Sequence, residues 1–323
     1  MATSSIQNPV WSGYCADPYV FRHGEFYYCC GTYFVSKDTP EIACPPRDHK
    51  KFVLLRSGDL SHWEYLGGAM EPVPGVDSEE YWAPEIAFSQ NRFWLYYSCL
   101  QPLGDSFNQR LRVAVADVPQ GPYRDCGKLL FPQLGFTIDA SPFRDPRTGQ
   151  WYLYFSKDDF EGRPGTGTAV VALNDDMVTA EGAIYPVVLP SADWQISGRN
   201  WKLYGRTFPE WHTVEGAHVV FHEGRYYCFY SGGNWMDASY GVAYAVAEHP
   251  LGPWLDAGTT RGACVLKGDD RTIGPGHNSI VRSADGQSHL CAYHAWDSQR
   301  IARQLCLDPV HWTPYGPKVY PSR

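Results

Sequence analysis

The amino-acid sequence predicts an all-β protein, because one hairpin pattern recurs along the whole chain and no stretch shows a competing helical periodicity. In each copy, an apolar strand-like run is followed by a turn and then by a second run rich in aromatic residues. The turn residue is always Gly or Asn, the residues that tolerate the positive φ of hairpin turns. These residues are Gly24, Asn91, Gly149, Gly224 and Gly286, at intervals of 58 to 75 residues.

A second hairpin is expected after each copy of the first. Its strands are the apolar runs at residues 52–56, 112–116, 169–173, 241–246 and 301–305. In four units a turn and an aromatic residue follow, at residues 60–63, 120–123, 251–254 and 310–312. Five units of four strands are typical of a five-bladed β-propeller. No Pro- or Ser-rich linker divides the chain, so we expect residues 1–323 to form one propeller domain.

Composition limits the kinds of partner. The chain has 323 residues, 44% of them hydrophobic and 15% aromatic, which suits a large core and faces that stack on sugars. A formal net charge of −8 without long Lys/Arg runs argues against nucleic acid. No apolar run reaches the roughly 18 residues that cross a bilayer. The first residues lack signal-peptide features, so we expect a cytoplasmic protein, or a secreted one if a leader has been removed.

The ten cysteines are expected to be core residues rather than disulfide partners or zinc ligands, because no Cys-x-x-Cys pair occurs. Cys29, Cys99, Cys228 and Cys291 each fall inside an apolar strand-like run. A free cysteine in such a run behaves as a small hydrophobic residue.

Acidic residues mark the starts of the first strands. In a propeller the first strand of each blade lines the central channel, so these starts converge at one end of it. They carry Asp17, Glu85, Asp139, Glu215 and His277. Carboxylates brought together in a partly dry pocket cannot all ionise at their ordinary pKa values, which leaves a neutral acid beside an ionised base. Glycoside hydrolysis needs that pairing. Metal binding is the other use of such a cluster, although motifs such as Asp-x-Asp-x-Asp are absent.

Five short motifs occur at these strand starts: Ala-Asp-Pro at 16–18, Tyr-Trp-Ala-Pro-Glu at 81–85, Ile-Asp-Ala-Ser-Pro at 138–142, Val-Glu-Gly-Ala at 214–217 and Gly-Pro-Gly-His-Asn-Ser at 274–279. In type and order they resemble those of glycoside hydrolase family 43, five-bladed propellers that cleave arabinose- and xylose-containing polysaccharides. The resemblance implies that Asp17 is the general base and Glu215 the general acid. It implies that Asp139 raises the pKa of the acid and orients it.

Further site residues follow from the same resemblance. Trp82 would offer a face to a pentose, with core packing as the alternative. His277 would lie near a hydrated cation, often calcium, in the channel, with a metal-free channel histidine as the alternative. Arg303 would contact the sugar or the modulating acid, with a structural ion pair as the alternative. Glu85 also fits its motif and is expected to be structural.

Two long segments, residues 35–50 and 189–212, exceed what a hairpin needs and are expected to fold over the channel mouth. Trp201 and Trp211 of the second segment would then form walls of a pocket for one terminal sugar, with packing on an outer blade as the alternative. Such a pocket favours an exo-acting enzyme, and a base that activates water implies an inverting one.

Because no C-terminal β-sandwich follows the propeller, an α-L-arabinofuranosidase acting on arabinan or arabinoxylan is favoured. A β-xylosidase, an endo-arabinanase and a catalytically inactive carbohydrate-binding propeller remain alternatives. Sialidase boxes of the Ser-x-Asp-x-Gly-x-Thr-Trp type are absent. The first motif reads Ala-Asp-Pro-Tyr rather than the Asn-Asp-Pro-Asn-Gly of fructoside-cleaving propellers.

Overall fold

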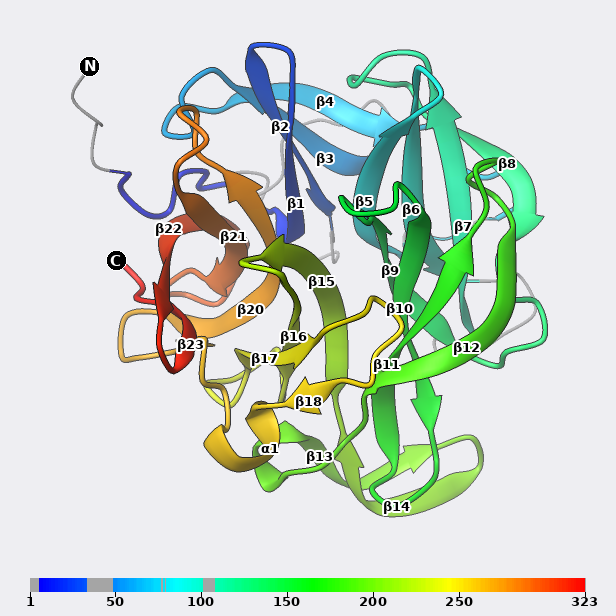
Figure 1. Ribbon diagram of the computed structural model, residues 1–323, viewed down its shortest axis with the longest axis vertical. Coiled ribbons are helices and arrows are strands. Elements are labelled where there is room, and N and C mark those ends of the chain that lie inside the picture. The colour runs from blue at the N-terminus through cyan, green and yellow to red at the C-terminus, as the bar shows by residue number, and fades with distance from the viewer. Residues whose placement is uncertain (1–5, 34–48, 77, 79, 101–107, 323) are drawn as a thin grey trace.

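The computed structural model describes residues 6–33, 49–76, 78, 80–100 and 108–322. These residues form antiparallel sheets arranged around a central axis, as Figure 1 shows. Inner strands of neighbouring sheets contact one another in a closed ring, in which the last strand returns to the first. The inner strands are β1 (Ala16–His23), β5 (Tyr81–Ser89), β9 (Thr137–Arg144), β15 (Val214–His222) and β20 (Ile273–Arg282). This ring confirms the predicted five-bladed β-propeller.

Blades one, two and five are four-stranded sheets whose strands follow chain order. Outside the inner strand, blade one has β2 (Phe26–Thr32), β3 (Lys51–Ser57) and β4 (Glu64–Met70). Blade two has β6 (Arg92–Leu100), β7 (Gln109–Ala116) and β8 (Arg124–Leu129). Blade five has β21 (His289–Trp296), β22 (Arg303–Thr313) and β23 (Gly316–Val319).

Blades three and four depart from this plan at their outer edges. Blade three has β10 (Trp151–Asp159), β11 (Gly165–Leu173) and β12 (Ala180–Val188). Blade four has β16 (Arg225–Gly232) and β17 (Gly241–Ala247), and two short strands, β18 (Leu255–Asp256) and β19 (Leu266–Lys267), both pair with β17. A short helix, α1 (Gly258–Arg261), lies between these two strands in the chain.

The five predicted hairpin turns are confirmed by the backbone. Each predicted turn residue has a positive φ, between 59° and 82°: Gly24, Asn91, Gly149, Gly224 and Gly286. One of the predicted outer turns is wrong, because Val310–Trp312 lies inside β22. This strand pairs with β21 over its first part and with β23 over its last, so its turn comes later, before Gly316.

Residues 189–212 are not a loop, as was expected, but a short 3-10 turn, η2 (Asp193–Gln195), and a hairpin of β13 (Ile196–Leu203) and β14 (Arg206–His212). The hairpin joins blade three through a single parallel pair, Gly165 with His212. It therefore extends that blade, at the bottom of Figure 1. The other segment expected to cover the mouth, residues 35–50, lies outside the described residues except for its last two.

The N-terminal segment closes the ring on blade five. The Val10 N–H donates to the Leu305 carbonyl (3.0 Å) and the Cys15 N–H to the Arg303 carbonyl (2.9 Å). The Asn8 amide donates to Asp308 at 2.8 Å. These contacts lie along the first half of β22, where its own blade has no fourth strand, so the two ends of the chain complete one blade together.

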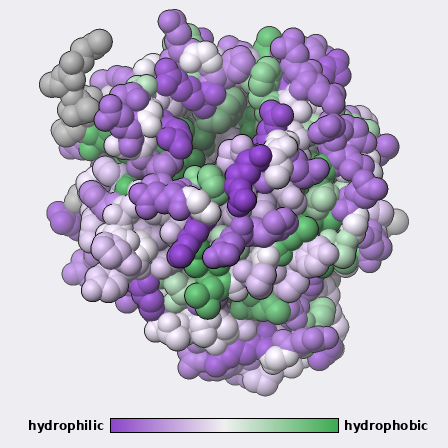
Figure 2. All heavy atoms as spheres, in the orientation of Figure 1, coloured by the Kyte–Doolittle hydropathy of each residue, from purple (hydrophilic) through white to green (hydrophobic). Residues whose placement is uncertain are grey.

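The core lies between the blades and is rich in fully buried tyrosines, as expected from the aromatic content. The described cysteines are free, and all but Cys126 are buried, which confirms their expected role in packing. Figure 2 shows a mostly hydrophilic face with apolar residues in scattered patches. No helix in the described part of the chain is long and apolar enough to cross a membrane.

Candidate active site

A β-bulge near the start of every inner strand builds the site. In each blade the register between the first two strands shifts around one residue with a positive φ. These five residues are Asp17, Ala83, Asp139, Gly216 and His277, with φ between 47° and 61°. Positive φ is uncommon for residues other than Gly, and bulges redirect side chains beside active sites. At three of the five positions the bulge therefore directs a side chain, that of Asp17, Asp139 or His277, into one end of the channel.

Side chains of the preceding blade hold four of these bulges in place by accepting the N–H of the bulged residue. Thr32 accepts the Ala83 N–H at 2.7 Å, and Ser231 accepts the His277 N–H at 2.7 Å. Asp139 accepts the Gly216 N–H, and His294 accepts the Asp17 N–H, both at 3.1 Å. Contacts between blades thus fix the strained backbone at the site.

The bulges correct the sequence alignment of the five strand starts. Asp17, Asp139 and His277 are equivalent, as predicted. Glu215 comes one residue before its bulge position and Glu85 two residues after. Turn spacing could not reveal this offset, because a bulge adds a residue to one strand without changing the pattern of apolar runs.

One pocket at the channel end collects six of the predicted residues. It has a volume of about 210 Å³. Among the described residues its lining consists of Tyr14, Asp17, Thr32, Trp82, Ile138, Asp139, Glu215, Trp235, His277 and Arg303. The three acids, Trp82, Arg303 and His277 therefore lie together, although they are spread over nearly 290 residues of the chain.

Asp17 lies among positive and polar groups. Arg303 Nη1 donates to Asp17 Oδ1 at 3.2 Å, and His277 Nδ1 lies 3.5 Å from the same oxygen. Burial by itself would raise the pKa of Asp17, but the charges of Arg303 and His277 outweigh it and hold the pKa well below its ordinary value. His294, kept neutral because burial and Arg303 lower its pKa to about 4, accepts the Asp17 N–H. Asp17 is thus held as a carboxylate.

Asp139 and Glu215 lie in the opposite electrostatic setting. Burial raises the pKa of Asp139 to about 7. The charge of Glu215 adds to this rise, whereas His277 opposes it. Burial also raises the pKa of Glu215 above its ordinary value, against the effects of His277 and of the 2.6 Å hydrogen bond donated by Tyr240. The site thus holds an ionised carboxylate and a carboxyl group that keeps its proton more readily, as an acid–base pair requires.

His277 was predicted to lie beside a cation. Burial disfavours its charged form, but Asp17, Asp139 and Glu215 outweigh this and raise its pKa. Direct metal ligation would need the neutral ring. In the part of the chain that the structure describes, no three His, Cys, Asp or Glu side chains form a metal-ligand set. These groups fit only an ion that lies near His277 and is held mostly through water, and calcium stays a prediction.

Glu85 follows the bulge residue Ala83 by two positions along β5 and is not part of the pocket lining. Its Oε1 lies 3.4 Å from His218 Nδ1, and Tyr19 packs against that ring. Its Oε2 is buried without a hydrogen-bond partner among the described residues. These contacts agree with the structural role expected of Glu85.

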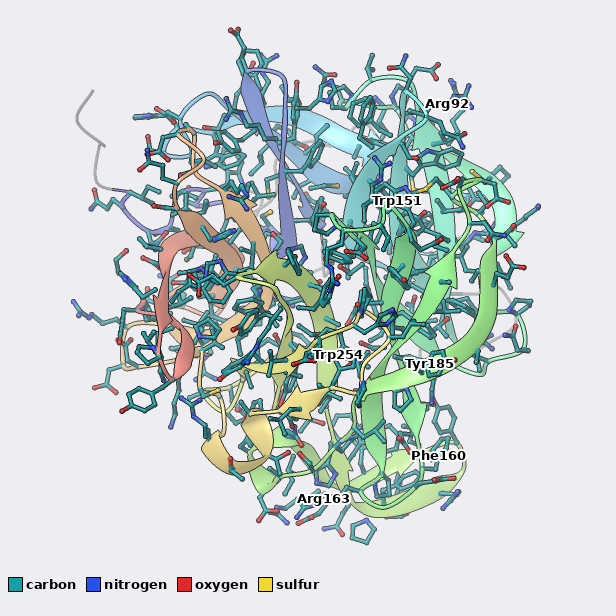
Figure 3. The ribbon with its side chains drawn as sticks, viewed as in Figure 1. Arg92, Trp151, Phe160, Arg163, Tyr185 and Trp254 are labelled. Carbon is teal, nitrogen blue, oxygen red and sulfur yellow. The ribbon has the colours of Figure 1, made fainter. Side chains whose placement is uncertain are left out.

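Trp201 and Trp211 do not line the pocket, contrary to prediction. They pack with Leu203 and Phe208 in a separate cluster on the β13–β14 hairpin. Phe160, labelled beside this hairpin in Figure 3, stacks on Phe208 and contacts Trp211. Large aromatic side chains that alternate along a hairpin bury one another across its strands. Packing within the hairpin therefore accounts for both tryptophans.

Several residues that line the pocket or contact its lining escaped sequence analysis. Thr32, Ser231 and His294 lie at the ends of second strands, which antiparallel pairing brings beside the starts of first strands. This antiparallel pairing could have been used to locate the three residues from the sequence. Trp235 and Tyr240 belong to the connection between β16 and β17, and no motif marks them.

Fold and site together fit a hydrolase of glycosidic bonds. The model of glycosyl hydrolases family 43 matches residues 6–317. The chain belongs to this family and is a glycoside hydrolase acting on O-glycosyl bonds.

The relatives differ in their named activities. The chain is 27% identical to the β-D-galactofuranosidase xynD of Aspergillus niger, over 96% of this chain and 83% of that one. It is 26% identical to an extracellular exo-α-(1→5)-L-arabinofuranosidase of Streptomyces avermitilis, covering 93% of this chain and 60% of the relative's length. A crystal structure of a thermostable family-43 glycoside hydrolase superimposes with a TM-score of 0.82 at 29% identity, over 98% of this chain and 96% of that one. Other relatives are named endo-arabinanase and xylosidase/arabinosidase.

Proposed function

We propose that this enzyme is an inverting, exo-acting α-L-arabinofuranosidase that releases terminal or branching arabinose from arabinan or arabinoxylan. The observation that carries the proposal is the contrast between Asp17 and Glu215 within one small pocket. Arg303 and His277 hold the first as a carboxylate, whereas burial favours the protonated form of the second.

The proposed reaction uses these two groups on opposite sides of the bound sugar. Glu215 donates its proton to the leaving glycosidic oxygen as the bond to the anomeric carbon breaks. Asp17 removes a proton from a water molecule whose oxygen attacks that carbon from the other face. Asp139 acts through Glu215, since it accepts the N–H of the next residue and adds negative charge nearby. A water between base and sugar gives inversion, and carboxyls of such enzymes stand roughly 6.5–9.5 Å apart.

The size of the pocket supports removal of one sugar at a time. Its volume of about 210 Å³ is below the roughly 300–1,000 Å³ of sites for drug-sized ligands. The indole of Trp82 offers an apolar wall for a single ring. The Streptomyces avermitilis relative, named an exo-acting arabinofuranosidase, favours arabinofuranose within this class. The Aspergillus niger relative makes β-D-galactofuranose the second candidate.

Three measurements test the proposal. The p-nitrophenyl glycosides of α-L-arabinofuranose, β-D-xylose and β-D-galactofuranose give the sugar, and we expect the first to have the highest kcat/KM. Debranched arabinan gives the mode of attack: monosaccharide should appear first, and early oligosaccharides with little arabinose would contradict exo action. Proton NMR of the first-formed sugar gives the stereochemistry, where a retained anomer would overturn the mechanism. No hydrolysis of any glycoside would favour the binding-only alternative.

A further inference from the structure

The connection between β16 and β17, residues 233–240, contacts Glu215 and the Arg303 side chain that pairs with Asp17. We call it the clasp loop. Near its start, Trp235 lies against Arg303, the partner of Asp17. At its end, Tyr240 bonds Glu215. Because the base and the acid come from different blades, a segment in contact with the surroundings of both can fix their relative position.

The Trp235 end of the loop acts on the base through Arg303. The Arg303 guanidinium carbon lies 4.5 Å from the centroid of the Trp235 ring, within the range of a cation–π contact. Arg303 is only 9% exposed and donates to Asp17 Oδ1 at 3.2 Å. The indole therefore restricts the side chain that pairs with the base.

Trp296, at the end of β21, holds Trp235 in place. The two rings stack with centroids 5.8 Å apart and an interplanar angle of 19°. The Trp296 Nε1–H donates to the backbone carbonyl of Trp235 at 2.8 Å. Blade five thus braces a loop of blade four at the same place where Arg303, also from blade five, enters the pocket.

The Tyr240 end contacts Glu215 directly and Asp17 through His294. Its hydroxyl donates to Glu215 Oε1 at 2.6 Å. Its ring lies parallel to the His294 ring, with centroids 5.8 Å apart and an interplanar angle of 9°. His294 in turn accepts the Asp17 N–H at 3.1 Å. The side chain is 1% exposed, so it has little freedom to change these contacts.

Hydrogen bonds within the loop join its two ends. The Asn234 N–H donates to Ser239 Oγ at 3.0 Å, and the Asp237 N–H donates to the Asn234 carbonyl at 3.0 Å. These two bonds hold the beginning and the end of the loop together.

We propose that the clasp loop, through Trp235 and Tyr240, is the positioning element that keeps Asp17 and Glu215 in register for the reaction. The inference rests on the proposed roles of these two acids. Neither loop residue transfers a proton: Trp235 acts through Arg303, and Tyr240 acts through Glu215 and His294.

A double-mutant cycle tests the Trp235 end. Trp235→Leu should lower kcat roughly 10- to 100-fold, because small misplacements of catalytic groups cost that much, and should leave KM nearly unchanged. In an Arg303→Lys background the same substitution should have much less effect, because its target is already altered. Met236→Ala, an exposed neighbour in the same loop, is the matched control and should behave as the unaltered enzyme. A raised KM with additive effects would instead make Trp235 a sugar-binding wall and overturn the proposal for it.

A leaving-group series tests the Tyr240 end. Tyr240→Phe keeps the ring against His294 and removes only the hydroxyl that holds Glu215. Its kcat/KM should fall most on glycosides with poor leaving groups and least on the 2,4-dinitrophenyl glycoside, whose leaving group departs without a proton. An equal loss on all of them, or no loss, would contradict the proposal.

Folding is checked by circular dichroism and thermal melting of each variant. If Trp235→Leu does not fold, Trp296→Phe replaces it in the cycle, since it keeps a ring and removes one N–H donor. Failure of the proposed catalytic roles is recognised separately. Activity retained by Asp17→Asn or Glu215→Gln would reject those roles. If these two variants are inactive but the loop variants are as active as Met236→Ala, only the proposed role of the clasp loop is rejected.

Discussion

The backbone N–H of Gly216 donates a 3.1 Å hydrogen bond to Oδ2 of Asp139, on the neighbouring blade. Gly216 directly follows Glu215, so Asp139 holds the peptide bond that carries the proposed acid. One carboxyl therefore influences the acid in two ways, by its charge and by fixing the backbone, and these two effects can be separated.

Asp139→Asn and Asp139→Ala should differ in severity. The asparagine oxygen can still accept the Gly216 N–H, so this variant loses charge but keeps the backbone contact. The alanine variant loses both. We expect kcat to fall by about 10²-fold or more for asparagine and further for alanine. Kinetics on the p-nitrophenyl glycoside provide the measurement, and equal rates for the two variants would show that the hydrogen bond has no catalytic effect.

Asp17→Asn and Glu215→Gln should each lower kcat by roughly 10²–10⁴-fold without unfolding the protein. Glu215→Gln should recover much of its loss on the 2,4-dinitrophenyl glycoside, because that leaving group needs no acid. Asp17→Asn should recover nothing there, since the attacking water still lacks its base. Glu248→Gln changes an exposed carboxylate and serves as the control. Near-normal activity of either variant would remove that residue from the reaction.

Gly216→Ala should damage both stability and activity. Gly216 has a φ of 61°, and a Cβ there would lie 3.2 Å from the His277 ring. Gly224→Ala is a matched control, since its φ is 82° but its Cβ would meet no atom within 4 Å. The left-handed backbone alone costs an alanine about 1–2 kcal/mol. Chemical denaturation should show a larger loss at Gly216, and activity should fall only there. Equal losses would mean that His277 moves aside freely.

The ion pair of Asp125 and Arg112 should make stability depend on pH in the acidic range. Arg112 Nη2 lies 2.6 Å from Asp125 Oδ1, and both side chains are at least nine-tenths buried. Burial would raise the pKa of Asp125, but hydrogen bonds from Arg112 and Tyr97 outweigh it and lower the pKa.

Because the folded-state pKa is depressed, the pair stabilises the protein above the unfolded value, near 3.9, and this stabilisation is lost as pH falls below it. Asp125→Asn should therefore lower Tm strongly at pH 7. The difference in Tm between the variant and the unaltered protein should become smaller below about pH 4. Melting curves between pH 3 and pH 7 check this expectation. A gap independent of pH would exclude linkage through Asp125.

Metal removal should reduce activity if a hydrated cation lies beside His277. We expect chelator treatment to lower kcat and added calcium to restore it, because the cation would help to keep the neighbouring carboxylate ionised. Metal analysis of the treated protein is needed alongside the kinetics. A fully active enzyme without metal would refute the calcium prediction.

The fold and three acids of the site could be predicted because they depend on local repetition. Each inner hairpin carries its own turn residue and its own short motif, so Asp17, Asp139 and Glu215 are visible without knowledge of distant contacts. The position of Glu85 could not be read correctly, since it lies two residues beyond its bulge residue, an offset that the apolar pattern does not reveal.

Contacts between blades were beyond the reach of the sequence. Tyr240 bonds Glu215 from a connection whose course depends on Trp296 in another blade. Trp201 and Trp211 were misplaced for a related reason. Their aromatic side chains suit a sugar site and a hairpin surface equally well, and only the strand pairing of residues 196–212 decides between these locations.

Joining residues 8–15 to β22 has a consequence for synthesis on the ribosome. Residues 8–15 are made well before residues 303–308 and must wait for them before blade five is complete. Until then the early blades can form their own hairpins, while the channel stays open along one seam and the groups of the pocket are not yet assembled. Asp17 leaves the ribosome long before Arg303, so the nascent chain can form the ion pair between them only after nearly 290 further residues have been made.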